Sequence, residues 1–204
     1  MPTSHGIDTY VDCSAHAADI KAAGVDFILG YWFDVKSFKH LLNHQDCVRY
    51  SDAGLWVGAI YQNSSDHATY FTAERGHTDA ASAGNCSANA HQPAGKPVFF
   101  AVDFDASQAD YDAHIKPYFQ AVNAWVKASG ATYTPGCYAN GLICRLLKTD
   151  GLVTHTMLSQ STGYREHAAW VPHADIVQGP TKKLLHFDVD TDTAHGTSGC
   201  WQVS

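Results

Sequence analysis

The chain has 204 residues, of which 45% are hydrophobic and 16% are charged, with a formal net charge of −7. This composition is typical of a globular protein, and the length suits one domain spanning residues 1–204. We expect no nucleic-acid partner, because no basic stripe would neutralise phosphates, and no membrane span, because no apolar run approaches roughly 20 residues.

Strands and helices are predicted to alternate from the start of the chain. Residues 6–11 form the first predicted strand, and residues 16–24 form a short helix that ends at a glycine. A second apolar strand covers residues 25–32. Apolar residues at helical spacing over 37–53 predict the next helix, and residues 55–62 predict a third strand.

The middle of the chain contains the longest predicted elements. Residues 67–90 are rich in alanine and predict one or two packed helices. Residues 97–105 form an almost unbroken apolar run, typical of a strand buried on both faces of a parallel sheet. A long amphipathic helix over 107–129 follows, then a fifth strand over 133–140 and a short helix over 141–147.

The last part of the chain adds three strand predictions, over residues 156–161, 174–178 and 184–190. Eight strands that alternate with helices predict a parallel α/β sheet closed into a (β/α)8 TIM-like barrel. The length is at the lower limit for such a barrel. We therefore expect a small barrel in which some late helices are short or missing.

Polar residues stand at the ends of most predicted strands, where barrel enzymes place their active sites. They include Asp8, Gln62, Asp103, Asp105, Tyr138, Asn140, Gln160, Gln178, Asp188 and Asp190. Asp103 and Asp105 are two residues apart, so we expect both side chains on one face of the strand. Because a barrel pairs its first strand with its eighth, Asp8 is expected near Asp188 and Asp190.

Aromatic side chains are expected to border this acidic mouth: Tyr31, Trp32, Tyr61 and Tyr138. Carboxyl groups beside aromatic and amide groups suit an uncharged polyhydroxylated substrate such as a glycan. Two plainer interpretations stay open. Asp188, Asp190 and Asp192 are also consistent with a solvated acidic loop, and Tyr61 and Tyr138 with core aromatics.

Five short motifs occur in an order that resembles a known family. They are residues 6–9, 54–57 leading into 60–62, 100–105, 136–141 and 158–161. Together they resemble the glycoside-hydrolase-like domain of unknown function 1906, a relative of the lysozymes of glycoside hydrolase family 25. The resemblance covers nearly the whole chain and implies a small barrel that acts on bacterial cell-wall polysaccharide.

In the family-25 lysozymes the fourth strand ends in Asp-x-Glu, and the Glu is the general acid. The matching residues here are Asp103 and Asp105, with Asp8 in the first-strand position. The resemblance therefore implies a peptidoglycan hydrolase in which Asp105 protonates the leaving oxygen and Asp103 stabilises positive charge. Same-face carboxyls cannot flank a sugar ring, which leaves assistance by the substrate's 2-acetamido group or water activated by Asp8 or Asp188. Of these two routes we expect acetamido assistance.

The remaining expected site residues support the glycan. Asp8 and Asp188 would hold water or sugar, and the contact residues would be Tyr31, Trp32, Tyr61, Tyr138 and Gln160. Two alternatives stay open. One is a glycan-binding barrel without catalysis, and the other is a metal-dependent polysaccharide deacetylase with Asp8, Asp103, His186 and Asp188 as ligands.

Cysteine spacing and the N-terminus bear on cofactors and location. None of the six cysteines forms a Cys-x-x-Cys pair, so we expect neither a structural zinc nor another cofactor. Cys137 and Cys144 are expected to lie close together. No signal peptide is visible. Extracellular or periplasmic action would therefore need another export route, or the chain stays in the cytoplasm; we expect a monomer.

Overall fold

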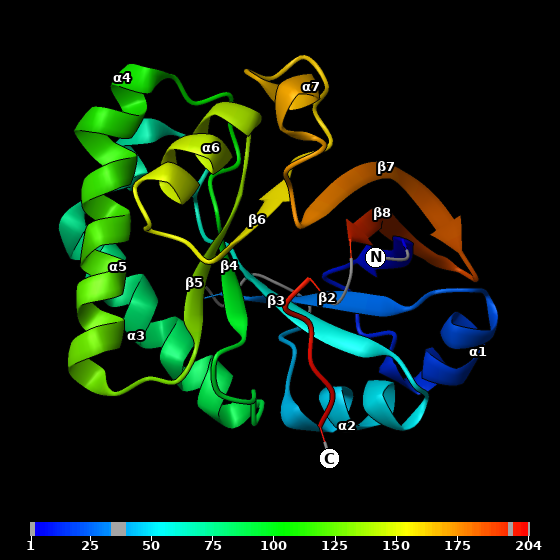
Figure 1. Ribbon diagram of the computed structural model, residues 1–204. Helices are drawn as coiled ribbons and strands as arrows, with labels where there is room; N and C mark the ends of the chain where they lie inside the picture. Colours follow the sequence, from blue (N-terminus) through cyan, green and yellow to red (C-terminus); the bar gives the residue numbers. More distant parts are fainter. Residues whose placement is uncertain (1–2, 34–39, 196–197, 204) are drawn as a thin grey trace.

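The computed structural model describes residues 3–33, 40–195 and 198–203. The strands close into one barrel in which neighbours in sequence are neighbours in space (Figure 1). They are β1 (Thr3–Asp8), β2 (Phe27–Trp32), β3 (Trp56–Tyr61), β4 (Pro97–Ala101), β5 (Thr134–Ala139), β6 (His155–Leu158), β7 (Ile176–Leu184) and β8 (Phe187–His195). The predicted closed α/β barrel is confirmed.

Helices cover the barrel unevenly, with the long pair α3 and α5 along one side (Figure 1). The α-helices are α1 (Ala17–Ala22), α2 (His44–Asp52), α3 (Ala73–Asn89), α4 (Gln108–Asp110), α5 (Lys116–Ser129), α6 (Gly141–Thr149) and α7 (His167–Trp170). Single 3-10 turns cover Ser14–His16 and Ala68–Tyr70, and a π-helical turn over Tyr111–Ile115 joins α4 to α5. Beyond α6, the described residues carry the single-turn α7 as their one further α-helix, as expected.

Helix boundaries follow local capping. Helix α2 begins after Asn43, whose side chain caps the backbone of Asp46 while Asp46 caps it in return. Because of this cap the helix starts later than the predicted residue 37, and residues 37–39 lie outside the described residues. Helix α5 ends where Gly130 adopts a left-handed φ of 73°.

The eighth strand runs opposite to the prediction. Strands β1 to β7 are parallel to their neighbours, but β8 is antiparallel to both β7 and β1. The reason is the short link: Leu184 pairs with Phe187, so only two residues connect β7 to β8. A parallel crossover needs a dozen or more residues. The first residues of β8 therefore lie at the same end of the barrel as the last residues of β1.

Alternation along the strands divides the core into two compartments. Inward side chains, such as Leu29, Phe99 and Met157, fill the barrel. Their sequence neighbours, such as Ile28 and Phe100, pack outward against the helices. Along each strand, alternate residues point into the barrel and out toward the helices. This alternation determines which aromatic residues reach the mouth. No helix among the described residues has the length and apolar character needed to cross a membrane.

Candidate functional site

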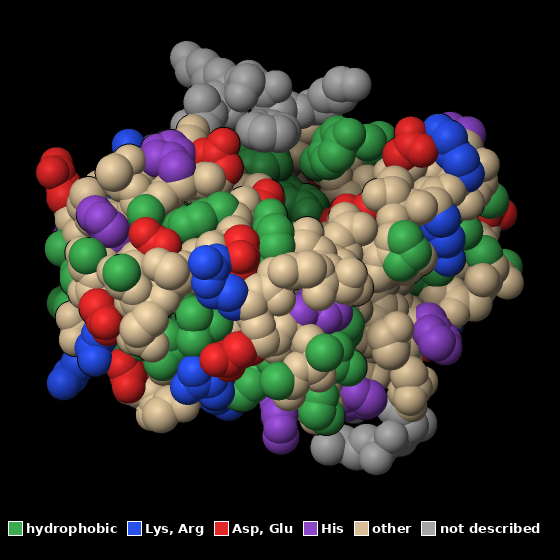
Figure 2. Space-filling model, turned by 90° about the horizontal axis from the view of Figure 1, so that it is seen from above, with side chains coloured by type: hydrophobic (Ala, Val, Ile, Leu, Met, Phe, Trp, Pro, Cys, Tyr) green, Lys and Arg blue, Asp and Glu red, His purple; other side chains and the backbone are tan. Residues whose placement is uncertain are grey.

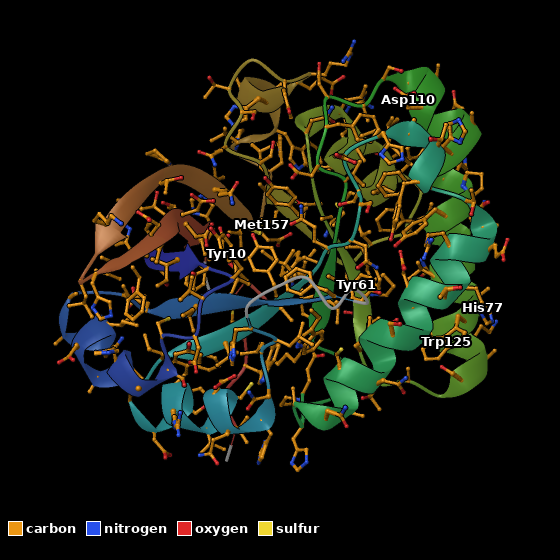
Figure 3. The ribbon with its side chains drawn as sticks, turned by 180° about the vertical axis from the view of Figure 1, so that it is seen from behind. Tyr10, Tyr61, His77, Asp110, Trp125 and Met157 are labelled. Atoms are coloured by element: carbon orange, nitrogen blue, oxygen red, sulfur yellow. The ribbon has the colours of Figure 1, made fainter. Side chains whose placement is uncertain are left out.

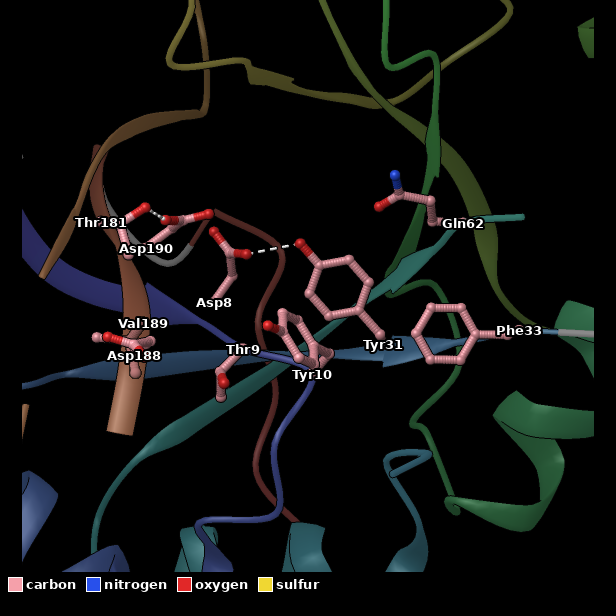
Figure 4. Close-up of a pocket in the computed structure, with 10 residues that line it drawn as sticks. All are labelled: Asp8, Thr9, Tyr10, Tyr31, Phe33, Gln62, Thr181, Asp188, Val189 and Asp190. Atoms are coloured by element: carbon pink, nitrogen blue, oxygen red, sulfur yellow. Dashed lines mark hydrogen bonds between the residues drawn. The ribbon is translucent and has the colours of Figure 1, made fainter. Parts of the chain in front are cut away.

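An open pocket of about 330 Å³ lies at the carboxyl ends of β1, β2 and β3, beside the start of β8. Seen from above, hydrophobic and acidic side chains border a hollow near the middle of this face (Figure 2). The pocket is lined by Asp8, Thr9, Tyr10, Tyr31, Phe33, Gln62, Thr181, Asp188, Val189 and Asp190 (Figure 4). Three of the ten are aspartates.

Asp8 is the buried carboxyl group of this pocket. It is the last residue of β1, and its side chain is 2% exposed. The Tyr31 hydroxyl donates to one carboxylate oxygen at 2.6 Å, and Gln178 Nε2 donates to the other at 2.8 Å. Burial outweighs these bonds and raises the pKa of Asp8 to about 6, with smaller contributions from the charges of Asp190 and Asp103.

Gln178 connects the polar side chains of the mouth. Its Nε2 donates to Asp8 and, at 3.4 Å, to Asp190. Its Oε1 accepts from the Tyr138 hydroxyl at 2.9 Å and from the backbone N–H of Gln160 at 3.3 Å. Gln178 was predicted at a strand end but not in the site. The available signal was its amide side chain at the end of a strand next to the acidic eighth strand.

Asp190 lies beside Asp8, as expected, although β8 runs in the opposite direction to the prediction. Asp190 pairs directly with Asp8 across the two antiparallel strands, and the Thr181 hydroxyl donates to it. Asp188 lies further out. Its carboxylate is exposed and receives Lys183 Nζ at 2.8 Å. Asp188 therefore lines the rim of the pocket as half of an exposed ion pair.

Asp103 faces the mouth from the other side of the ring. It follows β4, which ends at Ala101, and β4 stands opposite the strand of Asp190 in the eight-stranded order. Gln62 Nε2 donates to the Asp103 carboxylate at 3.0 Å, and the Asp103 backbone N–H donates to Ser65 at 2.8 Å. Burial raises the pKa of Asp103.

Asp105 does not share a face with Asp103, and that expectation is wrong. Strand alternation stops at Ala101, so the two carboxyls lie in a loop and diverge. Asp105 accepts from Asn140 Nδ2 at 3.0 Å, from the Arg165 backbone N–H at 2.8 Å, and from the Arg165 guanidinium. Asp105 thus anchors the loop that carries Arg165 and is not among the pocket-lining residues.

Two expected contact residues point away from the pocket. Trp32 follows the inward Tyr31, so its ring turns outward, is fully buried, and donates to the Leu42 carbonyl at 2.9 Å. Tyr61 is likewise buried in the outer compartment, where its hydroxyl lies 3.4 Å from Asp79 of α3. Tyr61 lies between the barrel and α3 in Figure 3. The prediction that Trp32 and Tyr61 contact substrate is corrected.

Other aromatic side chains take their place at the pocket. Tyr31 stacks on Phe33 with ring centroids 5.7 Å apart. Tyr10, 49% exposed, lies at the rim. Neither Tyr10 nor Phe33 was predicted at the site: Tyr10 fell inside the first predicted strand, which in fact ends at Asp8, and Phe33 lies just beyond β2. Gln160 is exposed and reaches the network through its backbone N–H rather than its side chain.

The ligands required for a metal-dependent deacetylase are not brought together. His186 packs on the Phe187 ring, with centroids 4.0 Å apart, in the turn between β7 and β8. The described residues that gather three possible metal ligands are instead Asp12, His40 and Asp46, outside the pocket. There His40 Nε2 lies 2.7 Å from Asp46, which is an ordinary histidine–carboxylate pair.

Residues 18–197 match the family model of the Rv2525c-like, glycoside hydrolase-like domain. The chain belongs to this family. The resemblance found in the sequence motifs is thereby confirmed.

Solved structures in this fold range from secreted proteins to lysozymes. The Tat-secreted protein Rv2525c of Mycobacterium tuberculosis, solved with L-tartrate, superposes with a TM-score of 0.80 and 23% identity, covering 97% of this chain and 98% of that chain. A lysozyme from Streptomyces coelicolor gives a TM-score of 0.58 and 14% identity, covering 95% and 92%. At these identities the likeness is one of fold.

A curated relative of the Rv2525c-like chain is the uncharacterized protein YbfG of Bacillus subtilis strain 168. The two are 34% identical over 119 residues, which is 55% of this chain. The matched part is only 16% of YbfG, so this chain spans a small fraction of that relative.

Proposed function

We propose that this Rv2525c-like domain binds bacterial cell-wall glycan at the barrel mouth and hydrolyses a glycosidic bond there, with Asp8 as the general acid. The observation that carries the proposal is the pocket-facing Asp8 carboxyl, whose pKa burial raises to about 6. A general acid must hold its proton near the working pH. Asp105 is less suited, because its carboxylate pairs with the Arg165 guanidinium, whereas Asp8 accepts only from neutral donors among the described residues.

The reaction would proceed with carboxyls on both sides of the sugar. Asp8 gives its proton to the glycosidic oxygen as the bond between that oxygen and the anomeric carbon breaks. Asp103, from the opposite side of the barrel mouth, stabilises the positive charge that develops on the sugar. Water then adds to the anomeric carbon, and its proton returns to the ionised Asp8.

The pocket walls support a sugar ligand. Tyr10 and the Tyr31–Phe33 stack offer aromatic faces, and Gln62 offers an amide to sugar hydroxyls. Rv2525c was crystallised with L-tartrate, which carries two hydroxyl groups. Lysozymes share the fold, and Rv2525c is secreted through the Tat route. We therefore place the action of this chain outside the cytoplasm, on peptidoglycan.

A second candidate is a glycan-binding domain without catalysis. The observation that favours it is the Asp105–Arg165 ion pair, which engages the residue in the position of the lysozyme acid. This domain would keep the same pocket and bind the same polymer.

Incubation with purified peptidoglycan, followed by mass analysis of the soluble products, separates the two. New reducing ends from the wild type, lost in Asp8→Asn, support hydrolysis. Binding of the polymer without soluble products supports the non-catalytic candidate. Neither binding nor products would contradict both.

A further inference from the structure

Asp192 is buried beneath the pocket without a hydrogen-bond partner. Its side chain is 2% exposed, and neither carboxylate oxygen has a partner. On β8 it shares the inward face with Asp190, one step deeper in the barrel, between Gly6 of β1 and Gln178 of β7. The interpretation of Asp192 as part of a solvated loop is therefore wrong.

The carboxyl groups around Asp192 lack cationic partners among the described residues. Asp8, Asp103 and Asp190 accept from neutral amide and hydroxyl donors, as described above. The ion pairs at this face involve other acids, since Arg165 binds Asp105 and Lys183 binds Asp188. Burial, together with the charges of Asp8 and Asp190, raises the pKa of Asp192 well above its usual value. Mutual repulsion is thus uncompensated within this part of the structure.

The spacing of these carboxyls suits an organic cation better than a metal ion. Three possible ligand atoms converge within 4.8 Å at Asp12, His40 and Asp46, and no such group is found at the mouth among the described residues. The Asp8 and Asp190 oxygens that share Gln178 Nε2 are at most 6.2 Å apart, the sum of the two bonds. An ammonium group, with three donors, can bridge oxygens at such separations.

The walls of the pocket fit the rest of such a ligand. The Tyr31–Phe33 stack and the exposed Tyr10 stand beside the carboxyls in a cavity of about 330 Å³ (Figure 4). Aromatic faces attract both sugar rings and cations. A neutral acetamido group offers one N–H donor and a carbonyl oxygen that carboxylates repel, whereas an ammonium offers three donors and a positive charge.

We propose that the pocket recognises a free, protonated amine on the glycan, so that de-N-acetylated amino sugars bind in preference to N-acetylated ones. The amine donates to Asp190 and to the carbonyl oxygen of the protonated Asp8. Its positive charge favours the ionised form of Asp192 beneath. This inference rests on the proposed glycan-binding function and names its substrate class. It reverses the expectation of acetamido assistance, whose basis was the shared face of Asp103 and Asp105.

The test is calorimetric titration of the full chain with two matched oligosaccharides, a glucosamine oligomer and its N-acetylated form, at a pH where the sugar amine is protonated. We expect the wild type to bind the amine form at least about tenfold more tightly, which is one decade in Kd. Asp190→Asn and Asp192→Asn should each lose most of this preference. Asp192→Asn is nearly isosteric, so we expect the barrel to fold. Circular dichroism checks that it is intact.

The control variant is Asp112→Asn, which removes one negative charge from an exposed helical position that does not line the pocket. It should keep the full preference for the amine. Equal affinity of the wild type for both oligomers would overturn the inference while leaving the proposed function standing. Failure to bind either oligomer would overturn both. Equal loss of preference in Asp112→Asn would show a net-charge effect and overturn the inference.

Discussion

Asp8 and Asp190 face each other as paired residues of the antiparallel strands β1 and β8, and Gln178 Nε2 donates to both carboxylates. Like charges at directly opposite positions destabilise a sheet. Such a pair is costly in a purely structural barrel, and functional sites commonly retain arrangements of this kind at the expense of stability.

Asp8→Asn is expected to change how stability depends on pH. The folded pKa of Asp8 is about 6, raised from 3.8, so the folded state binds the proton more tightly than the unfolded state. Protonated Asp8 contributes to the free energy of unfolding of the wild type below pH 3.8, and this contribution is lost as pH rises through 6. The loss is on the order of 3 kcal/mol. In thermal melts from acid to alkaline pH, the melting temperature of the wild type should therefore fall relative to that of the variant as pH rises.

Asp103→Asn should act in the same direction, because burial also raises the pKa of Asp103. Melting curves of either variant that run parallel to the wild type at all pH values would contradict the assignment of these raised pKa values.

Asp105→Asn is expected to behave as a structural substitution. Breaking the partly exposed pair with Arg165 should cost roughly 1 kcal/mol of stability. Glycan hydrolysis should stay within about tenfold of the wild type, since a tenfold change corresponds to 1.36 kcal/mol in the barrier. Melting temperature and initial rate are measured on the same preparation, with Asp112→Asn as the charge control. An unchanged melting temperature with abolished hydrolysis would return the acid role to Asp105.

Tyr31→Phe and Tyr61→Phe form a matched pair that differs in compartment. Removing the Tyr31 hydroxyl deletes the donor at 2.6 Å that lowers the pKa of Asp8. The alkaline limb of the pH–rate profile should then move to higher pH. Tyr61→Phe should leave this profile and glycan affinity unchanged and lower stability by about 1 kcal/mol. A shift in the pH–rate profile with Tyr61→Phe, and none with Tyr31→Phe, would contradict the assignment of Tyr31 to the pocket and Tyr61 to the outer compartment.

Cys137 and Cys144 are expected to be reduced neighbours. Their sulfur atoms are 4.0 Å apart, as anticipated from the short turn, and all six cysteines are free. Burial raises the pKa of the Cys137 thiol, so it should resist alkylation in the folded protein. Thiol titration of unfolded, unreduced protein should count six thiols. A count of four would indicate a bridge.

The sequence predicts much of the barrel because strand signals and loop lengths are local. Apolar runs that end in acids located β1 and β4 and placed Asp8 and Asp103 at the mouth, although both predicted strands ran past the observed ends at Asp8 and Ala101. The reversal of β8 was also accessible, since residues 179–183, between the two predicted strands, are too few for a parallel crossover. It was missed because the regular alternation of strands and helices suggested an eighth parallel unit.

The misassigned site residues fail for two physical reasons. Trp32 and Tyr61 were placed by their position at a strand end, whereas the face of the sheet is set by odd or even register. Asp105 was placed by extending strand alternation beyond the residue where β4 stops. The partner that holds it, Arg165, lies 60 residues away in sequence, and no local pattern links the two.

The most direct test of Asp8 as the general acid is the rate of peptidoglycan hydrolysis by Asp8→Asn beside Asp105→Asn and the wild type, read by mass analysis of the soluble products. We predict that Asp8→Asn loses about 10²- to 10⁴-fold in rate with its fold intact, whereas Asp105→Asn retains most of its activity. Wild-type rates in Asp8→Asn, with the loss found in Asp105→Asn, would contradict the assignment.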